Sequence, residues 1–311
     1  MIQKIYYNGH EEWLQLRKRG IGGSEAGVIM GVSKFATPYT LFMDKVGRAL
    51  PKEENMAMKI GTNLEQLVAD EFSRRNDKRV NKRHYMTLNT KYPWAIANID
   101  RKITCEDAIL ECKTTSSMPT MRDFRKGSYP DTWYCQVQHY MAVGNFKKAY
   151  IACIVTAFGG EYLQWEVDRD DDFIGVMMNM EHEFWERVQM DNPPPVSGSD
   201  DEYNIIKTLY PASDKTPAFL DSKDLQDDLK AYNDYGEQIK LYKGMQDACK
   251  ERLCLAMGTS DTGYVGSKKV CTWKEQSRKT FDFKKFTEDY PNFDITAYTN
   301  ISTNRVFKLS K

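Results

Sequence analysis

Residues 99–113 read IDRKITCEDAILECK, and the rest of the chain is organised around this stretch. The pattern predicts two short strands joined by a turn, with Asp100 on the first strand and Glu111 and Lys113 on the second. Side chains two residues apart on a strand project from the same face, so Glu111 and Lys113 project together. Asp100 can face them if the two strands pair as a hairpin.

Two carboxylates and one carbonyl oxygen form a hard oxygen site. Asp100, Glu111 and the backbone carbonyl of Cys112 are therefore candidate ligands for Mg²⁺ or Mn²⁺. Lys113 beside such a site can steady an attacking water or a phosphate oxygen, as metal-assisted phosphodiester hydrolysis requires. Most acid-x-lysine pairs on strands are solvated surface charges. Here apolar residues flank the charges, and charges at the ends of buried strands are costly unless something pairs with them.

Length, charge and cysteine content exclude several classes of protein. The chain has 311 residues, enough for a hydrophobic core and one or two domains. Its 44 basic and 44 acidic residues balance, so any basic surface for nucleic acid must be local. No stretch approaches the roughly 18 apolar residues of a membrane span, and residues 1–7 lack the apolar run of a signal peptide. The seven cysteines show no CxxC spacing, which argues against zinc ribbons and iron–sulfur clusters and favours reduced thiols in a cytoplasm.

A glycine-rich turn near the N-terminus is a candidate anion site. Residues 20–27 read GIGGSEAG, and Ser24 is expected to cap a helix there. Free N–H groups at a helix N-terminus bind anions. Arg17 and Arg19 end the preceding helix, predicted at residues 10–19, so the sequence predicts a pocket for a terminal phosphate. An ordinary capped turn stays the alternative.

Two further helices contribute candidate site residues. The helix predicted at residues 58–76 carries Glu65 beside a core position, from which it can reach the metal; a solvated face is the alternative. The helix predicted at residues 131–143 presents Gln136 and Tyr140 on one face, because they lie four residues apart. Gln136 can orient a catalytic lysine or a water.

A polar loop is a weaker candidate. Residues 114–129 carry Arg122, Arg125 and Lys126, which are plausible contacts for a nucleic-acid backbone. A solvent-exposed loop with no ligand is nearly as plausible.

The remaining pattern predicts two domains, residues 1–215 and residues 216–311. Further strands of the first are expected at 85–88, 94–104, 108–114, 149–157 and 161–167, and a further helix at 170–190. Helices around a mixed central sheet make an α/β or α+β core. The second domain is a C-terminal helical and β extension. It is expected to contain a long helix or helical hairpin at 222–257 interrupted by Gly236, strands at 263–273 and 279–283, a short helix at 284–289 and an edge strand at 305–308.

The order of these motifs resembles the PD-(D/E)xK nuclease fold. More closely, it is similar to the family of the phage lambda exonuclease and the YqaJ-type viral recombinases. The resemblance covers about residues 8–190, and Ile99 replaces the proline of the fold's name. Five blocks carry it in the right order: RKRGIGGSEAG (17–27), GTNLEQLVADEF (61–72), ANIDRKI (97–103), AILECKT (108–114) and CQVQHYM (135–141).

The resemblance implies a Mg²⁺-dependent exonuclease, with Mn²⁺ as a substitute and two ions per site. Such an enzyme degrades the 5′-ended strand of double-stranded DNA and leaves a 3′ overhang for a single-strand annealing protein. It also implies a bacterial cytoplasm, a phage or prophage origin and a trimeric ring. Carried over by matching position, the residues are the metal ligands Asp100 and Glu111, the water-positioning Lys113, the assisting Glu65, the supporting Gln136 and Tyr140, and the 5′-phosphate binders Arg17 and Ser24.

Two other functions stay open. The chain could be a structure-specific endonuclease of the same fold, but Arg17 with Ser24 favours an exonuclease that holds a 5′ end. It could instead be a non-catalytic DNA-end binder or recombination adaptor. The presence of Asp100, Glu111 and Lys113 together argues against that role, because a decayed site usually loses one of them.

Overall fold

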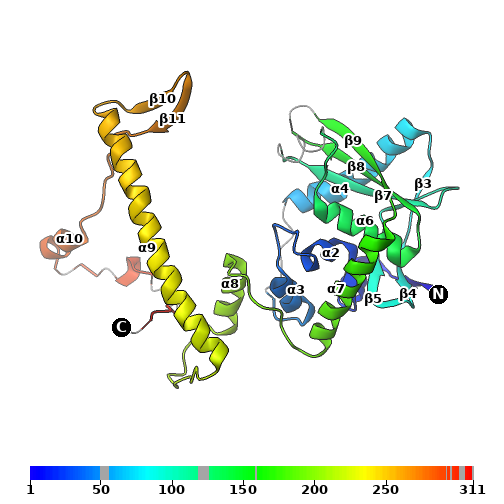
Figure 1. Cartoon of the computed structure of the whole chain (residues 1–311), viewed down its shortest axis with the longest axis horizontal. Helices are drawn as coiled ribbons and strands as arrows, with labels where there is room; N and C mark the ends of the chain where they lie inside the picture. The colour runs from blue at the N-terminus through cyan, green and yellow to red at the C-terminus, as the bar shows by residue number, and fades with distance from the viewer. Residues whose placement is uncertain are drawn as a thin grey trace. The chain divides into compact units, whose positions relative to one another are not determined.

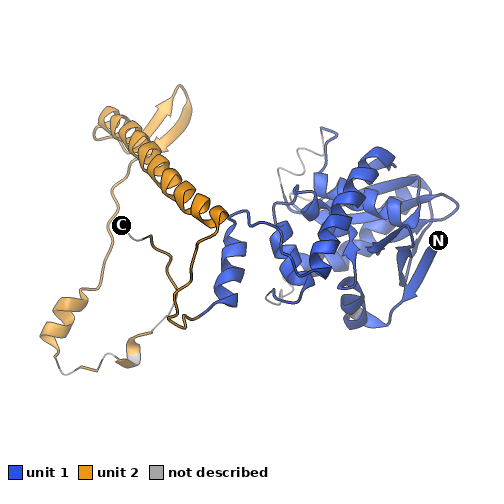
Figure 2. Ribbon diagram, turned by 60° about the horizontal axis from the view of Figure 1, so that its bottom comes forward, with its two compact units in different colours: residues 1–211 blue, residues 212–311 orange. Residues whose placement is uncertain are grey.

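The computed structural model describes residues 1–49, 56–117, 126–157, 160–291, 293–294, 296–300 and 305–309. The chain divides into two compact units, residues 1–211 and residues 212–311, which Figure 2 colours separately. Each unit is described here by itself. None of the helices in the described ranges combines the length and the apolar character that a membrane span needs.

Unit 1 contains two β-sheets. The larger has the order β3 (Val80–Lys82), β6 (Arg101–Ile103), β7 (Ala108–Thr115), β8 (Lys148–Val155) and β9 (Glu161–Asp168). Strands β7 and β8 are parallel and the other neighbours antiparallel, so this sheet is mixed. The smaller has the order β1 (Ile2–Tyr6), β4 (Tyr85–Asn89), β5 (Tyr92–Ala97) and β2 (Ile21–Gly22).

Helices cover both faces of the larger sheet (Figure 1). Strand β7 is apolar on both faces, as a central strand must be. Leu110 packs with Phe72 of α4 (Met56–Asn76), whereas Ile109 packs with Val137 of α6 (Asp131–Gly144) on the other side. The prediction of a mixed sheet flanked by helices is confirmed.

A buried ion pair ties α6 to its neighbours. His139 Nδ1 lies 2.8 Å from Glu181 Oε1 on α7 (Asp171–Gln189), and His139 Nε2 lies 3.1 Å from the Ile96 carbonyl oxygen on β5. Burial alone would lower the pKa of His139, but the Glu181 carboxylate outweighs it and the net shift is upward. His139 therefore serves packing: it fixes α6 between α7 and β5.

Four further helices complete unit 1: α1 (Gly9–Arg17), α2 (Gly23–Ile29), α3 (Pro38–Lys45) and α8 (Asp200–Leu209). Helix α8 is not among the predicted elements. Its sequence signal is SDDE at residues 199–202, which follows the three prolines at 193–195. Ser199 is the N-cap of the helix, because its Oγ accepts the Glu202 N–H.

The predicted strand at 94–104 is wrong as a single element. Strand β5 ends at Ala97 and β6 begins at Arg101, so Asp100 lies in the bend between them. The physical reason is that β5 belongs to the smaller sheet and β6 to the larger one, and the chain crosses between the sheets here.

Unit 2 consists of α9 (Lys223–Met257), the hairpin β10 (Thr262–Val265) and β11 (Lys268–Thr272), α10 (Phe283–Asp289) and the 3₁₀ turn η1 (Thr296–Tyr298). The predicted interruption of α9 at Gly236 is wrong, because the helix runs through it. The strands predicted at 279–283 and 305–308 are also wrong. In the described part of unit 2 only β10 and β11 pair, so these segments have no ladder to join.

Candidate active site

Four predicted site residues meet between β7 and α6; we call Glu111, Lys113, Gln136 and Tyr140 the β7–α6 cluster. Lys113 Nζ donates to Glu111 Oε1 and to Gln136 Oε1, both at 2.7 Å. Gln136 Nε2 donates to the same Glu111 oxygen at 2.7 Å and to the Tyr140 hydroxyl at 3.1 Å. Strand alternation and the helical i,i+4 spacing produce this meeting, as the sequence predicts.

The surroundings of the cluster shift the pKa of Lys113 and of Tyr140 upward. Burial by itself would lower the pKa of Lys113, but the nearby carboxylates Glu111 and Asp100 outweigh it and the net shift is upward. Burial, and then the same two carboxylates, hold the pKa of Tyr140 well above its usual value. At neutral pH the cluster therefore presents an ammonium group and a neutral phenol.

Asp100 lies beside this cluster, although it is not on a strand. Its Oδ2 accepts the Cys112 N–H at 2.8 Å, which fixes the carboxyl against β7. Burial raises the pKa of Asp100 well above its usual value, and the carboxylates of Glu111 and Glu65 raise it further. Glu111 Oε2 is buried and has no hydrogen-bond partner in the described part of the chain. The site thus brings two carboxyl groups together beside one ammonium group and leaves one Glu111 oxygen as an unfilled acceptor, a donor set that fits a divalent cation.

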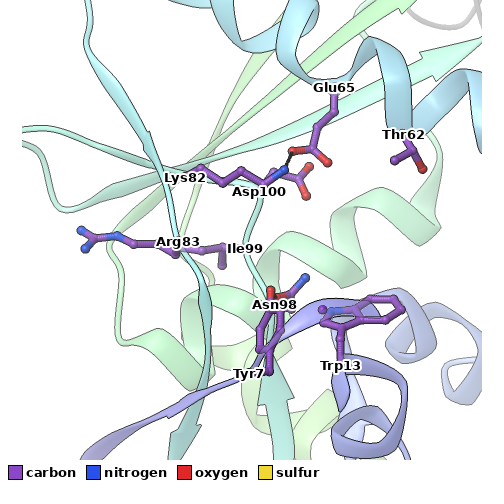
Figure 3. Close-up of a pocket in the computed structure, with 10 residues that line it drawn as sticks. Tyr7, Trp13, Thr62, Glu65, Lys82, Arg83, Asn98, Ile99 and Asp100 are labelled. Carbon is purple, nitrogen blue, oxygen red and sulfur yellow. Dashed lines mark hydrogen bonds and ion pairs between the residues drawn. The ribbon is translucent and has the colours of Figure 1, made fainter. Parts of the chain in front are cut away.

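Glu65 of α4 lies near Asp100, with Lys82 beside it (Figure 3), and it is paired with two cations, Lys82 and Arg101. Its Oε1 accepts hydrogen bonds from Arg101 and, at 3.1 Å, from Lys82. Burial would raise the pKa of Glu65, yet these hydrogen bonds outweigh it and the pKa is lowered. Arg101 also donates to the Asp100 carbonyl oxygen at 2.8 Å, so it links α4 to the bend.

The ligand set available to a metal is small. Among the described residues, no three His, Cys, Asp or Glu side chains gather in a metal-binding arrangement. The predicted set needs only two such side chains, Asp100 and Glu111, together with the Cys112 carbonyl. Because Glu65 is held by Arg101 and Lys82, its assisting role stays a prediction.

A pocket of about 520 Å³ opens beside Asp100 (Figure 3). Its volume and its mixed lining of aromatic, charged and polar side chains suit a nucleotide-sized ligand. The sequence analysis does not identify Lys82, Arg83 or Asn98 as lining residues; the basic run at residues 82–84 is their only signal. The lining residues are Tyr7, Gly9, Trp13, Thr62, Glu65, Lys82, Arg83, Asn98, Ile99 and Asp100.

A smaller hollow of about 50 Å³ lies next to it and shares Trp13 and Asn98 with it. Arg17 and Ser24 line this hollow with Gly22, Gly23 and Tyr140, and we call it the anion pocket. Arg17 Nη2 donates to Ser24 Oγ at 3.1 Å, and its guanidinium lies 4.9 Å from the Trp13 ring centre. The structure thus brings Arg17 and Ser24 together.

The predicted capping role of Ser24 is wrong. Gly22 is the N-cap of α2, and Ser24 is the second residue of the helix. The reason is that the Glu25 carboxylate accepts the Gly22 N–H at 2.8 Å and fixes the turn two residues earlier. The Ser24 hydroxyl is thereby free of the capping role and faces Arg17.

Glu25 and Lys45 support the anion pocket, and the sequence analysis misses both. Glu25 Oε2 lies 2.7 Å from Lys45 Nζ, and Glu25 Oε1 lies 3.4 Å from Arg17 Nη2. Lys45 also donates to the carbonyl oxygens of Arg17 at 3.0 Å and Gly20 at 2.6 Å. This buried ammonium therefore holds the end of α1 and the turn together.

Of the other basic candidates, the structure describes Arg19 and Lys126, and neither lines the anion pocket. Arg19 is exposed and does not line it, so its DNA-binding role stays a prediction. Lys126 is exposed as well. Arg122 and Arg125 lie outside the described residues.

Comparisons with known proteins agree with this architecture. A solved alkaline exonuclease, LHK-Exo from Laribacter hongkongensis, has a TM-score of 0.51 at 18% identity and covers 65% of this chain and 100% of its own. Its complex with dAMP has a TM-score of 0.52 at 17% identity, over the same shares of the two chains. These likenesses show a shared fold, and the predicted fold class is confirmed.

Sequence comparison goes further. The model of the YqaJ-like viral recombinase domain matches residues 12–147. The uncharacterized protein YqaJ of Bacillus subtilis (strain 168) is 31% identical over 287 residues, which are 91% of this chain and 88% of YqaJ. The chain therefore belongs to the YqaJ-like viral recombinase family.

Proposed function

We propose that this chain is a metal-dependent exonuclease that degrades the 5′-ended strand of double-stranded DNA and leaves a 3′ overhang for an annealing protein. The observation that carries the proposal is the nearness of the Asp100 carboxyl to Glu111, whose Oε2 has no hydrogen-bond partner in the described part of the chain, beside the Lys113 ammonium group. Family membership supports a recombination role, and a neighbour of the same fold is an alkaline exonuclease.

The residues present fit Mg²⁺, or Mn²⁺ in its place. Asp100, Glu111 and the Cys112 carbonyl would hold it, and Glu65 would assist through water, as part of a site for two ions. A bound ion would supply an activated water and neutralise charge on the phosphate. Without it, two buried carboxylates face each other with one oxygen unfilled.

The protein's own groups then position the substrate. Lys113, gripped between Glu111 and Gln136, is an ammonium that can hold the attacking water or a phosphate oxygen. The hydrogen bond to Gln136 orients the Lys113 ammonium, and Gln136 is itself oriented by the hydrogen bond that it donates to the Tyr140 hydroxyl. Such preorganised charge accelerates phosphodiester hydrolysis because nothing has to reorient during the reaction.

The anion pocket supports the 5′-to-3′ direction. It adjoins the larger pocket through Trp13 and Asn98, so a 5′-phosphate bound by Arg17 and Ser24 would set the next phosphodiester near Asp100. We also propose an annealing protein as partner and the cytoplasm of a bacterial host as location. The trimeric ring stays a prediction.

Digestion of linear duplex DNA tests the proposal. The substrates carry 5′-phosphate or 5′-hydroxyl ends, and covalently closed circles serve alongside, with Mg²⁺, with Mn²⁺ or with chelator. The wild type is compared with Lys113→Ala and with Lys147→Ala, an exposed lysine outside both pockets. We expect metal-dependent loss of the 5′-phosphorylated strand that Lys113→Ala abolishes and Lys147→Ala leaves unchanged.

Other outcomes separate the alternatives. Cutting of closed circles would favour the structure-specific endonuclease. Binding of DNA ends without cutting, in either metal, would favour the adaptor and leave Asp100 and Glu111 without the proposed role. Equal loss of both kinds of end would keep the nuclease but reject the phosphate role of Arg17 and Ser24.

A further inference from the structure

The long helix of unit 2 carries an apolar stripe that the rest of unit 2 leaves open. No residue of α9 is buried against the described part of the chain, and Ile239 at the centre of the stripe is 69% exposed. The spacings along the stripe are three or four residues and average 3.5 residues, the mean repeat of a two-stranded coiled coil. The stripe is Leu225, Leu229, Tyr232, Tyr235, Ile239, Tyr242, Met245, Cys249 and Leu253.

Such a helix needs a packing partner. It has 35 residues and is about 52 Å long at 1.5 Å per residue. Gly236 and Gly244 each weaken it by about 1 kcal/mol relative to alanine. Most helical stability in proteins comes from packing of an apolar face. The ring centroid of Tyr232 lies 5.5 Å from that of Phe307, yet Tyr232 is still 56% exposed.

The charges of α9 identify the partner. Residues 223–239 hold five acidic and two basic side chains, a net charge of −3, whereas residues 240–257 hold four basic and two acidic ones, a net charge of +2. In an antiparallel pair centred near residue 240, the acidic half of each helix faces the basic half of the other. In a parallel pair, like charges face each other. The antiparallel pair sets Asp228 level with Arg252 of the second copy.

We propose that α9 pairs with α9 of a second copy of this chain as an antiparallel coiled coil. Through this pairing, unit 2 joins each copy of the chain to one further copy, in addition to any contacts that unit 1 makes. The pairing does not depend on the proposed nuclease activity.

Sedimentation velocity of the full chain tests the pairing. The variant Ile239→Lys/Tyr242→Lys places two charges in the stripe, and we expect its dissociation constant to rise at least about 100-fold, so its mass is half that of the wild type. The control, Gln226→Lys/Asn233→Glu, places two charges at exposed positions off the stripe and leaves the net charge of residues 223–239 at −3, so it should keep the wild-type mass; circular dichroism checks helix content. Equal mass for the wild type and the stripe variant would overturn the proposal, as would docking of α9 on its own unit 1.

A charge exchange tests the orientation. Asp224→Lys/Asp228→Lys and Lys250→Glu/Arg252→Glu should each weaken association about tenfold, because each sets like charges against the other half. The variant with all four changes restores complementarity and should associate within about threefold of the wild type. Failure of the fourfold variant to recover would reject the antiparallel arrangement.

Discussion

The β7–α6 cluster and the anion pocket lie side by side, yet they are built with opposite charge balance. In the cluster, Glu111 and nearby Asp100 outnumber the Lys113 ammonium, and one Glu111 oxygen is unfilled. The anion pocket is lined by the Arg17 guanidinium and by no carboxylate of the described residues; Glu25, which supports it from behind the lining, is shared by Arg17 and Lys45.

The difference suits a phosphodiester substrate, which needs a cation at the bond that breaks and donors at the phosphate that is held. The first region presents carboxyl oxygens, which suit a cation, whereas the second presents the Arg17 guanidinium and the Ser24 hydroxyl. The two regions touch through Tyr140, which belongs to the cluster and also lines the anion pocket. Substitutions should therefore separate a metal-dependent effect from a phosphate-dependent one.

Asp100→Asn should have the largest effect. The substitution keeps an acceptor for the Cys112 N–H but removes the charge that would bind metal. We expect cleavage to fall about 10³-fold or more, since metal-bound water and charge neutralisation are each worth several kcal/mol. Strand-loss rates at saturating Mg²⁺ measure the fall, and calorimetric titration with Mg²⁺ should show weakened binding. Cleavage within tenfold of the wild type would remove Asp100 from the metal site.

The same variant makes a prediction for stability. Because burial and the carboxylates of Glu111 and Glu65 raise the pKa of Asp100, the folded protein binds this proton more tightly than the unfolded chain does. The free energy of unfolding therefore falls as pH rises from the ordinary Asp pKa through the raised one. In chelator at about pH 8, Asp100→Asn should melt at a higher temperature than the wild type. The gap should narrow near pH 4, and Mg²⁺ should stabilise only the wild type.

Gln136→Met comes next. It keeps the length of the side chain but removes both hydrogen bonds that align Lys113 and Glu111. We expect cleavage to fall about 10- to 100-fold, the usual cost of losing a residue that orients a metal site or its neighbours. Gln164→Met, at an exposed glutamine on β9, is the matched control. An unchanged cleavage rate would mean that Lys113 keeps its position without Gln136.

The cluster could be predicted from the sequence because its geometry is local. Two-residue spacing on β7 and four-residue spacing on α6 fix which side chains share a face, so Glu111, Lys113, Gln136 and Tyr140 follow from periodicity. The sequence also predicts Asp100 near them, but on a strand of a hairpin, and this part of the prediction is wrong. Asp100 reaches β7 from a bend where the chain changes sheets, which a strand pattern does not reveal.

The supporting ion pairs could not be predicted in this way. Glu25 meets Lys45, and Glu65 meets Arg101, across segments that lie apart in the sequence and join only when α2, α3, α4 and β6 pack. No local pattern marks such partners. The N-cap differs from these pairs, because the Glu25 carboxylate accepts the N–H of Gly22 only three residues away; this local capping pattern makes Gly22 the N-cap in place of Ser24.

Arg17→Gln should separate the anion pocket from the cluster. It removes the guanidinium that would hold a terminal phosphate but leaves the cluster intact. A charged hydrogen bond is worth about 1.5–3 kcal/mol, so we expect the preference for 5′-phosphate over 5′-hydroxyl ends to fall about tenfold. Arg19→Gln, two residues along and exposed, is the control. If Arg19→Gln lowers the preference more than Arg17→Gln does, the phosphate lies outside the pocket.

Gly23→Ala should have the smallest effect on activity, but it acts on both regions at once. A Cβ at this position would lie 2.5 Å from the Tyr140 ring, so the ring must shift and its hydroxyl leaves Gln136. We expect an overpacking cost of about 1–3 kcal/mol in stability. Cleavage rate and 5′-phosphate preference should each fall only about threefold. Gly175→Ala, at a helical glycine without positive φ whose added Cβ would meet no atom within 4 Å, is the matched control without a clash. If Gly23→Ala changed the cleavage rate and left the end preference intact, the two regions would be independent despite their shared wall at Tyr140.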